Sequence, residues 1–421
     1  MSKARHSGVT ITAGLPGPKA RHSGVAIGYV SPQPKARHSG VAINPLTGLP
    51  RAHHSGVAIK TASLPVARHS GLLLSTAATG VSTQWIMTAE GLVPLGQPQT
   101  GTPPYPAWGP YGELGTYVPG LGTSGATWES GSPPSNITMT GNQTITVANT
   151  VWEGREIYGN VSIKAANVTI RNCRIWGSIN APTTNTGLIH CDNAACVNAI
   201  LEDNTLRPQT PSSYWDGIRG HDYKARRNDV SGTTDGISVV NGSAPSAISN
   251  VEIDANWIHD FAYRTDPQQG DGHTHNDGTQ IHGCNGVKIR GNNYSGFIDS
   301  SVSNVTKPYA GNQVSGQAIL IQPQNANEVN ITIQWNFFDG WGEACVHLAP
   351  KNLPSGAAGL VDNVDIWSNR YGRNQARVSS NGLQNTVRVK VSTTITNVDV
   401  PLSGDLANLY LDTLTPITVT T

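Results

Sequence analysis

The sequence lacks an excess of charge of either sign. Its 28 lysines and arginines nearly balance its 27 aspartates and glutamates, which leaves a net charge of +1 over 421 residues. Proteins that bind nucleic acid or anionic membranes in general carry a basic excess. No stretch approaches the roughly 18 consecutive apolar residues of a membrane span. The composition therefore predicts no nucleic-acid partner and no membrane insertion.

Cysteine is scarce, and an apolar leader is missing. Five cysteines make an odd number without a CxxC pair, which does not suit a disulfide framework. We predict buried thiols in a chain that folds in a reducing compartment, and leave open whether Cys191 and Cys196 are bridged. The opening "MSKARHSG" has no apolar core of a signal peptide, so we expect assembly in the cytoplasm. No cofactor motif is present, and we expect no cofactor.

Good helix formers are also in short supply. Charged residues make up only 13% of the chain, whereas 46 glycines and many Asn, Thr, Ser and Val residues are present. Glycine and β-branched residues are unfavourable in helices. The composition therefore predicts an all-β protein.

The first 80 residues contain five copies of one short sequence motif, or phrase. His-Ser-Gly recurs at spacings of 16, 16, 16 and 15 residues, each time before an apolar patch such as "GVAI". The conserved positions of the phrase are Arg5, His6, Arg21, His22, Arg37, His38, His54, Arg68 and His69. Repeated weak sites multiply affinity for a symmetric partner, so we interpret residues 1–80 as an extended docking arm. A flexible spacer and metal capture by the histidines are the alternatives, and single histidines 16 apart are poor ligands.

The amino-acid composition and pattern change twice after the repeats, at about residue 81 and at about residue 136. Residues 81–135 are rich in Pro, Gly and aromatic residues, which is typical of a neck or linker. From residue 136, short β-branched segments recur with an asparagine at a fixed offset, and an apolar residue follows two positions later. The asparagine column comprises Asn204, Asn228, Asn256, Asn292, Asn336 and Asn369, with Cys173 in the first copy.

A right-handed parallel β-helix explains that column. Its coils stack about 4.8 Å apart, so that equivalent residues lie above one another. Asparagine at an inward turn bonds its neighbour and tolerates a left-handed backbone. About seven coils are detectable over residues 136–384, with nine or ten if weaker ends count. An antiparallel sandwich would not repeat one asparagine offset. Residues 385–421 alternate apolar and polar residues, which predicts a cap or an association segment.

The segments "GNVSIKAANVTIRNCRIWG" and "HNDGTQIHG", together with the asparagine column, resemble the pectate-lyase-like β-helix of phage tail fibres and tailspikes. They resemble more narrowly the minor tail proteins of phages that infect actinobacteria. The resemblance implies a virion component, commonly a homotrimer, that docks to tail-tip or baseplate proteins through its N-terminus. It also implies that the β-helix recognises host cell-wall polysaccharide. A polysaccharide depolymerase, either hydrolase or lyase, is the alternative, and the sequence favours binding without cleavage.

Three Asp-Gly pairs are the strongest catalytic candidates. Asp216, Asp235 and Asp277 each precede a strand, and in a β-helix they would occupy one corner of consecutive coils. Neighbouring carboxylates would then lie about 5 Å apart and next-nearest ones about 10 Å, which brackets the two geometries of glycoside hydrolysis. Like charges so close raise one pKa and create an acid beside a base. The alternative is that Asp-Gly merely forms turns.

Two further groups of residues are candidates for binding. The segment "GDGHTHNDGTQIHG" places His273, His275 and Asp277 at alternating positions, which could supply a base or a metal site. A polar loop that bonds its own backbone is the favoured alternative. Aromatic residues near these loops could stack on sugar rings, or pack between coils. These aromatic candidates are Tyr214, Trp215, Tyr263 and Trp341.

Overall fold

In this computed structural model, side chains are described for residues 119–420, with gaps at 121–123, 129–131, 241–249, 306–311, 377–385, 404–405 and 412–414. Within residues 1–118, the description covers the backbone of eleven short strands. Contacts divide the chain into two units, one made mainly of residues 1–117 and the other of residues 118–410 and 415–421. We describe each unit by itself.

The strands of the first unit pair from repeat to repeat. One parallel sheet contains β1 (Lys3–Ala4), β3 (Lys19–Ala20), β5 (Lys35–Ala36) and β7 (Arg51–Ala52). A second sheet is mixed, because its last strands pair antiparallel, and it contains β2 (Thr10–Thr12), β4 (Ala26–Tyr29), β6 (Ala42–Pro45), β8 (Ala58–Lys60), β9 (Leu72–Thr76), β10 (Thr83–Thr88) and β11 (Gly91–Leu95). Ala26 pairs with Ala42 and Ala42 with Ala58, so the register follows the 16-residue period of the sequence.

The recurring arginines and histidines of the docking phrase lie outside the described residues. These are Arg5, His6, Arg21, His22, Arg37, His38, His54, Arg68 and His69. The docking role of residues 1–80 therefore stays a prediction.

Three long parallel sheets build the second unit. The first contains β12 (Thr138–Thr140), β15 (Glu156–Tyr158), β18 (Arg174–Ile175), β21 (Thr205–Leu206), β24 (Asp229–Ser231), β27 (Trp257–His259), β30 (Asn293–Ser295), β33 (Phe337–Asp339), β36 (Arg370–Tyr371) and β39 (Leu409–Tyr410). The second contains β13 (Gln143–Ile145), β16 (Val161–Ile163), β19 (Thr186–Cys191), β22 (Trp215–Gly220), β25 (Asp235–Val239), β28 (Thr279–Ile281), β31 (Gln317–Ile321), β34 (Ala344–Leu348), β37 (Val387–Val389) and β40 (Val419–Thr420). The third contains β14 (Val151–Glu153), β17 (Thr169–Arg171), β20 (Ala199–Glu202), β23 (Tyr223–Arg226), β26 (Ile248–Asp254), β29 (Asn285–Arg290), β32 (Glu328–Gln334), β35 (Val361–Trp367) and β38 (Ile395–Asp399).

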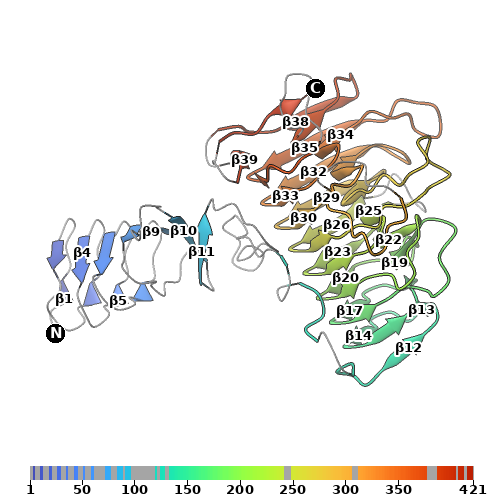
Figure 1. Cartoon of the computed structure of the whole chain (residues 1–421), viewed down its shortest axis with the longest axis horizontal. Helices are drawn as coiled ribbons and strands as arrows, with labels where there is room; N and C mark the ends of the chain where they lie inside the picture. The colour runs from blue at the N-terminus through green and yellow to red at the C-terminus, as the bar shows by residue number, and fades with distance from the viewer. Residues whose placement is uncertain are drawn as a thin grey trace. The chain divides into compact units, whose positions relative to one another are not determined.

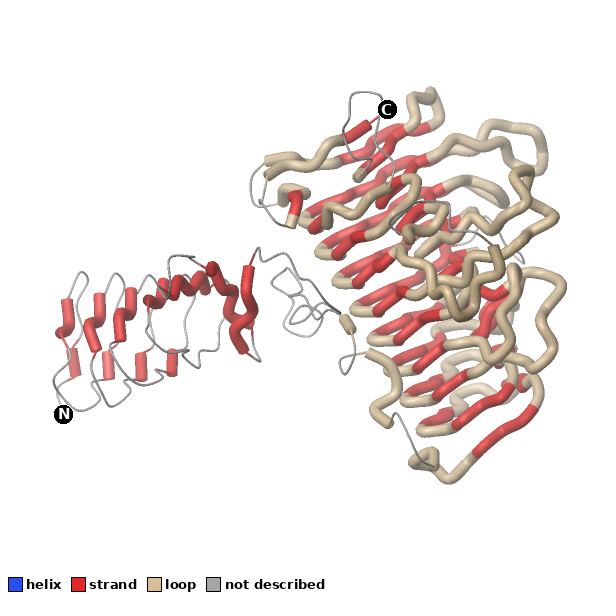
Figure 2. The backbone as a smooth tube through the Cα atoms, viewed as in Figure 1, coloured by secondary structure: helices blue, strands red, loops and turns tan. Residues whose placement is uncertain are grey.

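Each coil contributes one strand to each sheet, so every strand pairs with the strand three places further along the chain. The stacked coils are visible in Figure 1, and Figure 2 shows strands and loops alternating along each coil. The predicted right-handed parallel β-helix is confirmed, and sheets of ten, ten and nine strands match the predicted nine or ten coils. Strands β37 to β40 extend these same sheets, so the C-terminal segment continues the coil stack. In the described part of the chain, no helix has the length and hydropathy that a membrane crossing requires.

A ladder of buried asparagines runs along one corner of the coils. Each side-chain amide nitrogen donates to the amide oxygen of the next asparagine, at 2.9–3.0 Å. It also donates to a backbone carbonyl of the preceding coil. The structure places all six predicted positions in this ladder and adds Asn408 at its end. The members are Asn204, Asn228, Asn256, Asn292, Asn336, Asn369 and Asn408.

The left-handed backbone of this corner belongs to the residue before each asparagine, and not to the ladder asparagine as the sequence suggested. These preceding residues have φ between 50° and 64°. They are Asp203, Arg227, Ala255, Gly291, Trp335 and Ser368. The ladder amides satisfy the buried backbone groups of the bend, and this stabilises a conformation that most L-residues avoid.

Apolar columns fill the interior beside the ladder. Ile258 pairs with Tyr294, Tyr294 with Phe338, and Phe338 with Tyr371, all in register. The rings of Tyr294, Phe338 and Tyr371 lie 5.1–5.3 Å apart between centroids. All five cysteines are buried with free thiols, so the prediction of buried cysteines is confirmed. Burial of such rings and aliphatic chains is the main favourable term in stacking the coils.

We predict that Asn256→Ala destabilises the β-helix by at least about 2 kcal/mol. Loss of the Asn256 side-chain amide leaves the backbone N–H of Asn228 and the carbonyl of Ala225 without their hydrogen-bond partners in the interior. Thermal unfolding followed by circular dichroism measures the effect. Asn180→Ala is the control because Asn180 is exposed. Equal shifts in the two variants would contradict a special role of the ladder.

Candidate functional site

Asp216, Asp235 and Asp277 stack at one corner of three consecutive coils. Asp216 pairs in register with Asp235 across β22 and β25. Asp235 lies beside Asp277 because the N–H of Asp277 donates to the Oδ1 of Asp235 at 2.8 Å and the N–H of Gly236 donates to the carbonyl of Asp277. The juxtaposition that the sequence predicted is thus present in the structure. Whether these carboxyls are catalytic stays a prediction.

The glycine after each aspartate occupies a crowded position, in a strand for Gly217 and Gly236 and in the bend directly before β28 for Gly278. A Cβ atom on Gly236 would lie 2.4 Å from the carbonyl oxygen of Gly278 and from a methyl group of Ile258. A Cβ on Gly278 would meet the carbonyl of Ala318 at 2.6 Å. Glycine is therefore required for close packing, and this packing brings the carboxyls of successive coils together.

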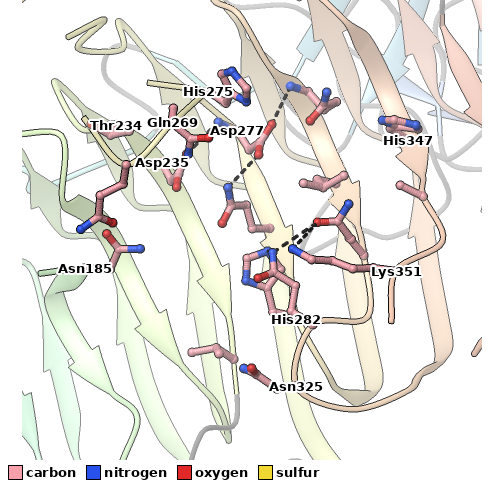
Figure 3. A pocket seen from close by; sticks show the side chains of 18 of the residues that line it. Asn185, Thr234, Asp235, Gln269, His275, Asp277, His282, Asn325, His347 and Lys351 are labelled. Carbon is pink, nitrogen blue, oxygen red and sulfur yellow. Dashed lines mark hydrogen bonds between the residues drawn. The ribbon is translucent and has the colours of Figure 1, made fainter. Parts of the chain in front are cut away.

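The Asp235 and Asp277 side chains line a polar pocket with a volume of about 490 Å³. Its floor is the outer face of the second sheet, where Arg219, Gln280 and His347 occupy equivalent positions on different strands. One rim of the pocket is formed by Asp235 and Asp277, and His275 lies at this rim. His282 and Lys351 lie on the other side of the floor (Figure 3). A pocket that runs across several coils suits an extended ligand lying along the helix axis.

Burial raises the pKa values of the stacked carboxyls. For Asp277, burial raises the pKa to about 7, although the backbone N–H of Gln317 and the amide of Gln280 donate to its two oxygens. For Asp235, burial and then the charges of Asp216 and Asp277 raise the pKa well above its usual range. For Asp216, burial raises the pKa against the opposing pull of Arg219, which donates to its Oδ2 at 2.9 Å. The corner therefore places Asp235, whose pKa is raised well above its usual range, next to a carboxyl that titrates near neutrality.

Side chains from distant loops form the opposite rim. Lys351 donates to the Oε1 of Gln322 at 3.3 Å, and the Nε2 of Gln324 lies 3.0 Å from the Nε2 of His282. Burial lowers the pKa of His282 to about 3, so this imidazole is neutral. Of these residues, only His282 lies in a segment already noted from the sequence, "GDGHTHNDGTQIHG". A signal for the others was available, because polar residues directly follow successive strands, but loops of unequal length hid the register.

His273, His275 and Asp277 do not gather into a metal site. His275 bonds Asp271 at 2.9 Å between Nε2 and Oδ2 and lies at the pocket, whereas His273 packs against Tyr263. Among residues 119–420 as described, no group of three His, Cys, Asp or Glu residues could hold a metal ion. The segment is a polar loop that bonds its own backbone, through the bonds between Arg264 and Thr274 among others.

Three of the four aromatic residues predicted to stack on sugars are buried. Trp215, Tyr263 and Trp341 have at most 3% of their surface exposed and belong to the core. The indole N–H of Trp341 donates to the carbonyl of Tyr294, and that of Trp215 to Thr210. The prediction was wrong for these three because it used their position near loops, which does not fix the face on which a side chain lies. Tyr214 is half-buried, and its role stays open.

No family model matches this sequence, and no curated protein sequence matches it. Among solved structures, the A-module of mannuronan C-5 epimerase AlgE6 from Azotobacter vinelandii is similar with a TM-score of 0.37 and 11% identity, covering 96% of this chain and 92% of that one. The tailspike of Escherichia coli bacteriophage HK620, in complex with a pentasaccharide, has a TM-score of 0.34 and 14% identity, covering 97% and 71%. The catalytic unit of a GH87 α-1,3-glucanase from Streptomyces thermodiastaticus has a TM-score of 0.30 and 10% identity, covering 98% and 66%. Likenesses this low carry no argument about activity, and the fold rests on the strand pairing itself.

We predict that the Asp277 carboxyl stabilises the protein at about pH 4 and that this contribution is lost as pH rises to about 7. A folded carboxyl with a raised pKa binds more protons than the unfolded chain in this window, so its stabilising contribution is present at low pH and lost as pH rises through the folded pKa. Asp277→Asn should therefore narrow the difference between the unfolding midpoints at pH 5 and pH 8. Asp365→Asn, with its carboxyl partly exposed on the third sheet, should keep most of the difference. An unchanged difference in Asp277→Asn would contradict the assignment.

Proposed function

We propose that this chain is a tail fibre or tailspike-like virion protein that binds a host cell-surface polysaccharide in the Asp235–Asp277 pocket and cleaves it. The observation that carries the proposal is the pair of stacked carboxyls on the wall of one polar pocket, where the pKa of Asp235 is raised well above its usual range and the pKa of Asp277 is about 7. Perturbed carboxyls in a pocket are typical of acid–base sites.

In the proposed hydrolysis, the protonated carboxyl of Asp235 donates its proton to the glycosidic oxygen as the bond to the anomeric carbon breaks. Asp277, in its ionised form, attacks the anomeric carbon and forms a covalent glycosyl ester, because neighbouring coils hold the two carboxyls about 5 Å apart, which is the separation of the retaining mechanism. Asp235, now ionised, then takes a proton from the water that displaces Asp277 from that carbon, and both carboxyls return to their starting forms. Arg219 bonds Asp216 at the end of the stack. The negative charge of Asp216 raises the pKa of Asp235.

Binding without cleavage is the second candidate. Asp277 has 1% of its surface exposed and both its oxygens accept hydrogen bonds, which is the arrangement of a structural carboxyl. In this case the pocket would recognise the polysaccharide and the fibre would only hold it. Attachment through residues 1–80, the homotrimeric state and the tail-tip partners belong to both candidates as proposals.

We predict that Asp235→Asn and Asp277→Asn each lower the release of reducing ends from purified host cell-wall polysaccharide by about 100-fold or more, because one variant removes the acid and the other removes the nucleophile. Binding of the polymer should remain. The rate of the unchanged protein should fall as pH drops below about 7, since Asp277 becomes protonated. Asp365→Asn is the matched control. Binding with no release by the unchanged protein would favour the second candidate.

We predict that deletion of residues 1–80 removes the protein from assembled virions. Five equivalent phrases joined by spacers provide multivalent attachment, and this is lost with them. The measurement is the amount of the protein in purified particles. A variant with the same 80 residues in scrambled order is the control, because it keeps length and composition. Normal incorporation of the scrambled variant would show that the repeats act as a spacer.

A further inference from the structure

Two lysines stand close together on the rim of the pocket opposite the aspartates. Lys351 follows β34 and Lys390 follows β37, and the N–H of Lys390 donates to the carbonyl of Leu348, so they belong to neighbouring coils at one corner. Both side chains are exposed. Within the described residues, neither ammonium takes part in an ion pair, whereas the third cation of the pocket, Arg219, is paired with Asp216.

The side-chain amides of Gln322 and Gln324 lie beside Lys351, and hydrogen bonds fix their orientation. Lys351 and the Nε2 of Gln324 both donate to the Oε1 of Gln322, each at 3.3 Å. The same Nε2 lies 3.0 Å from the Nε2 of His282, and this imidazole is neutral and accepts the bond. No hydrogen bond within the described residues uses the amide nitrogen of Gln322. This rim therefore offers an ammonium group and an amide N–H in an arrangement fixed by its own contacts.

We infer that this rim binds an anionic group, a carboxylate or a phosphate, carried by the polysaccharide. The inference rests on the proposed function and names its substrate class as an acidic polysaccharide. Two cations without ion-pair partners in the described part of the chain and the unused amide N–H of Gln322 match the charge and the acceptor atoms of an oxyanion, whereas a neutral sugar gains no charge-assisted hydrogen bond from the lysines beyond those that any hydroxyl accepts. The coil of Lys351 lies two steps beyond the coil of Asp277, which is about 10 Å along the helix axis, and Lys351 also lies across the pocket floor from Asp277. The anionic group therefore belongs to a sugar that is not bonded directly at the site of cleavage.

Binding measured by calorimetry tests the inference. The full chain carrying Asp277→Asn would be titrated with a uronic-acid polymer, a polyglycerol phosphate and a neutral glucan of similar length. We expect one acidic polymer to bind, with an affinity that falls as salt is added, and the neutral glucan to bind far more weakly. Which of the two acidic polymers binds identifies the anionic group as carboxylate or phosphate.

Lysine substitutions added to the Asp277→Asn chain test whether Lys351 and Lys390 bind the acidic polymer. Lys351→Met and Lys390→Met should each weaken binding of the acidic polymer by about tenfold, the effect of losing a charge-assisted hydrogen bond. Lys288→Met is the matched control, because Lys288 is an exposed lysine on β29 of the third sheet. An equal loss in Lys288→Met, or equal binding of acidic and neutral polymers, would overturn the inference.

The two proposals fail in different ways. If the unchanged protein binds the acidic polymer through Lys351 and Lys390 but releases no reducing ends from it, the inference stands and cleavage is wrong. If the unchanged protein cleaves a neutral glucan, and the lysine variants cleave it equally well, cleavage stands and the inference is overturned.

Discussion

The asparagine ladder is the interaction on which the rest of the structure depends. Each coil must bend sharply while its backbone groups are shut away from water, and the ladder amides bond those groups in both directions along the stack. An unpaired polar group in this position would cost roughly 1–3 kcal/mol. The ladder also fixes the register of one coil on the next, because each amide meets its neighbour at only one offset. All three sheets inherit that register.

The register of the coils places the aspartates of the pocket one above another, and burial of these carboxyls lowers the stability of the fold. With the coils in register, Asp216, Asp235 and Asp277 lie one above another, and Gly236 and Gly278 let the strands behind them pack closely. Removing like-charged carboxyls from water raises their pKa values, which lowers the stability of the fold at neutral pH. A stack held together by the ladder and the apolar columns tolerates that cost. Such local conflict between stability and charge is what a site of acid–base chemistry requires.

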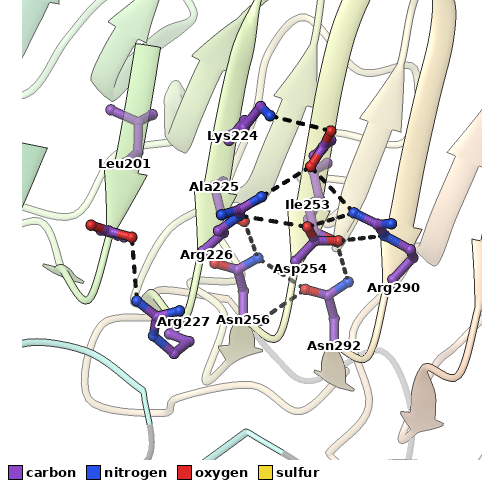
Figure 4. A network of polar contacts seen from close by, with 12 residues as sticks. Leu201, Lys224, Ala225, Arg226, Arg227, Ile253, Asp254, Asn256, Arg290 and Asn292 are labelled. Carbon is purple, nitrogen blue, oxygen red and sulfur yellow. Dashed lines mark hydrogen bonds and ion pairs between the residues drawn. The ribbon is translucent and has the colours of Figure 1, made fainter. Parts of the chain in front are cut away.

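Charges on the third sheet show the contrasting, structural arrangement. Arg290 contacts Glu252 and Asp254 at 3.2 and 2.8 Å, and Lys224 and Arg226 contact the same acids from the neighbouring strand (Figure 4). Every charge in this group has an opposite partner within 4 Å. At the pocket on the second sheet, the like charges of the aspartates are stacked and the two lysines stand without acids. The same coil geometry therefore produces a compensated surface on one side and an uncompensated pocket on another.

The sequence by itself determined the features that repeat with the coil. The asparagine column, the apolar positions two residues later and the Asp-Gly corner follow a local pattern, because each coil imposes the same strand and the same bend on its own residues. Only the tertiary structure decided what lies across the pocket from the aspartates. Gln322 and Lys351 come from later coils, and loops of unequal length precede the strands that carry them, so no fixed spacing links them to Asp277. Burial was likewise decided by the fold. Trp215 and Trp341 lie near loops in the sequence but point into the core, because the side of the sheet on which a residue lies depends on strand register and not on distance along the chain.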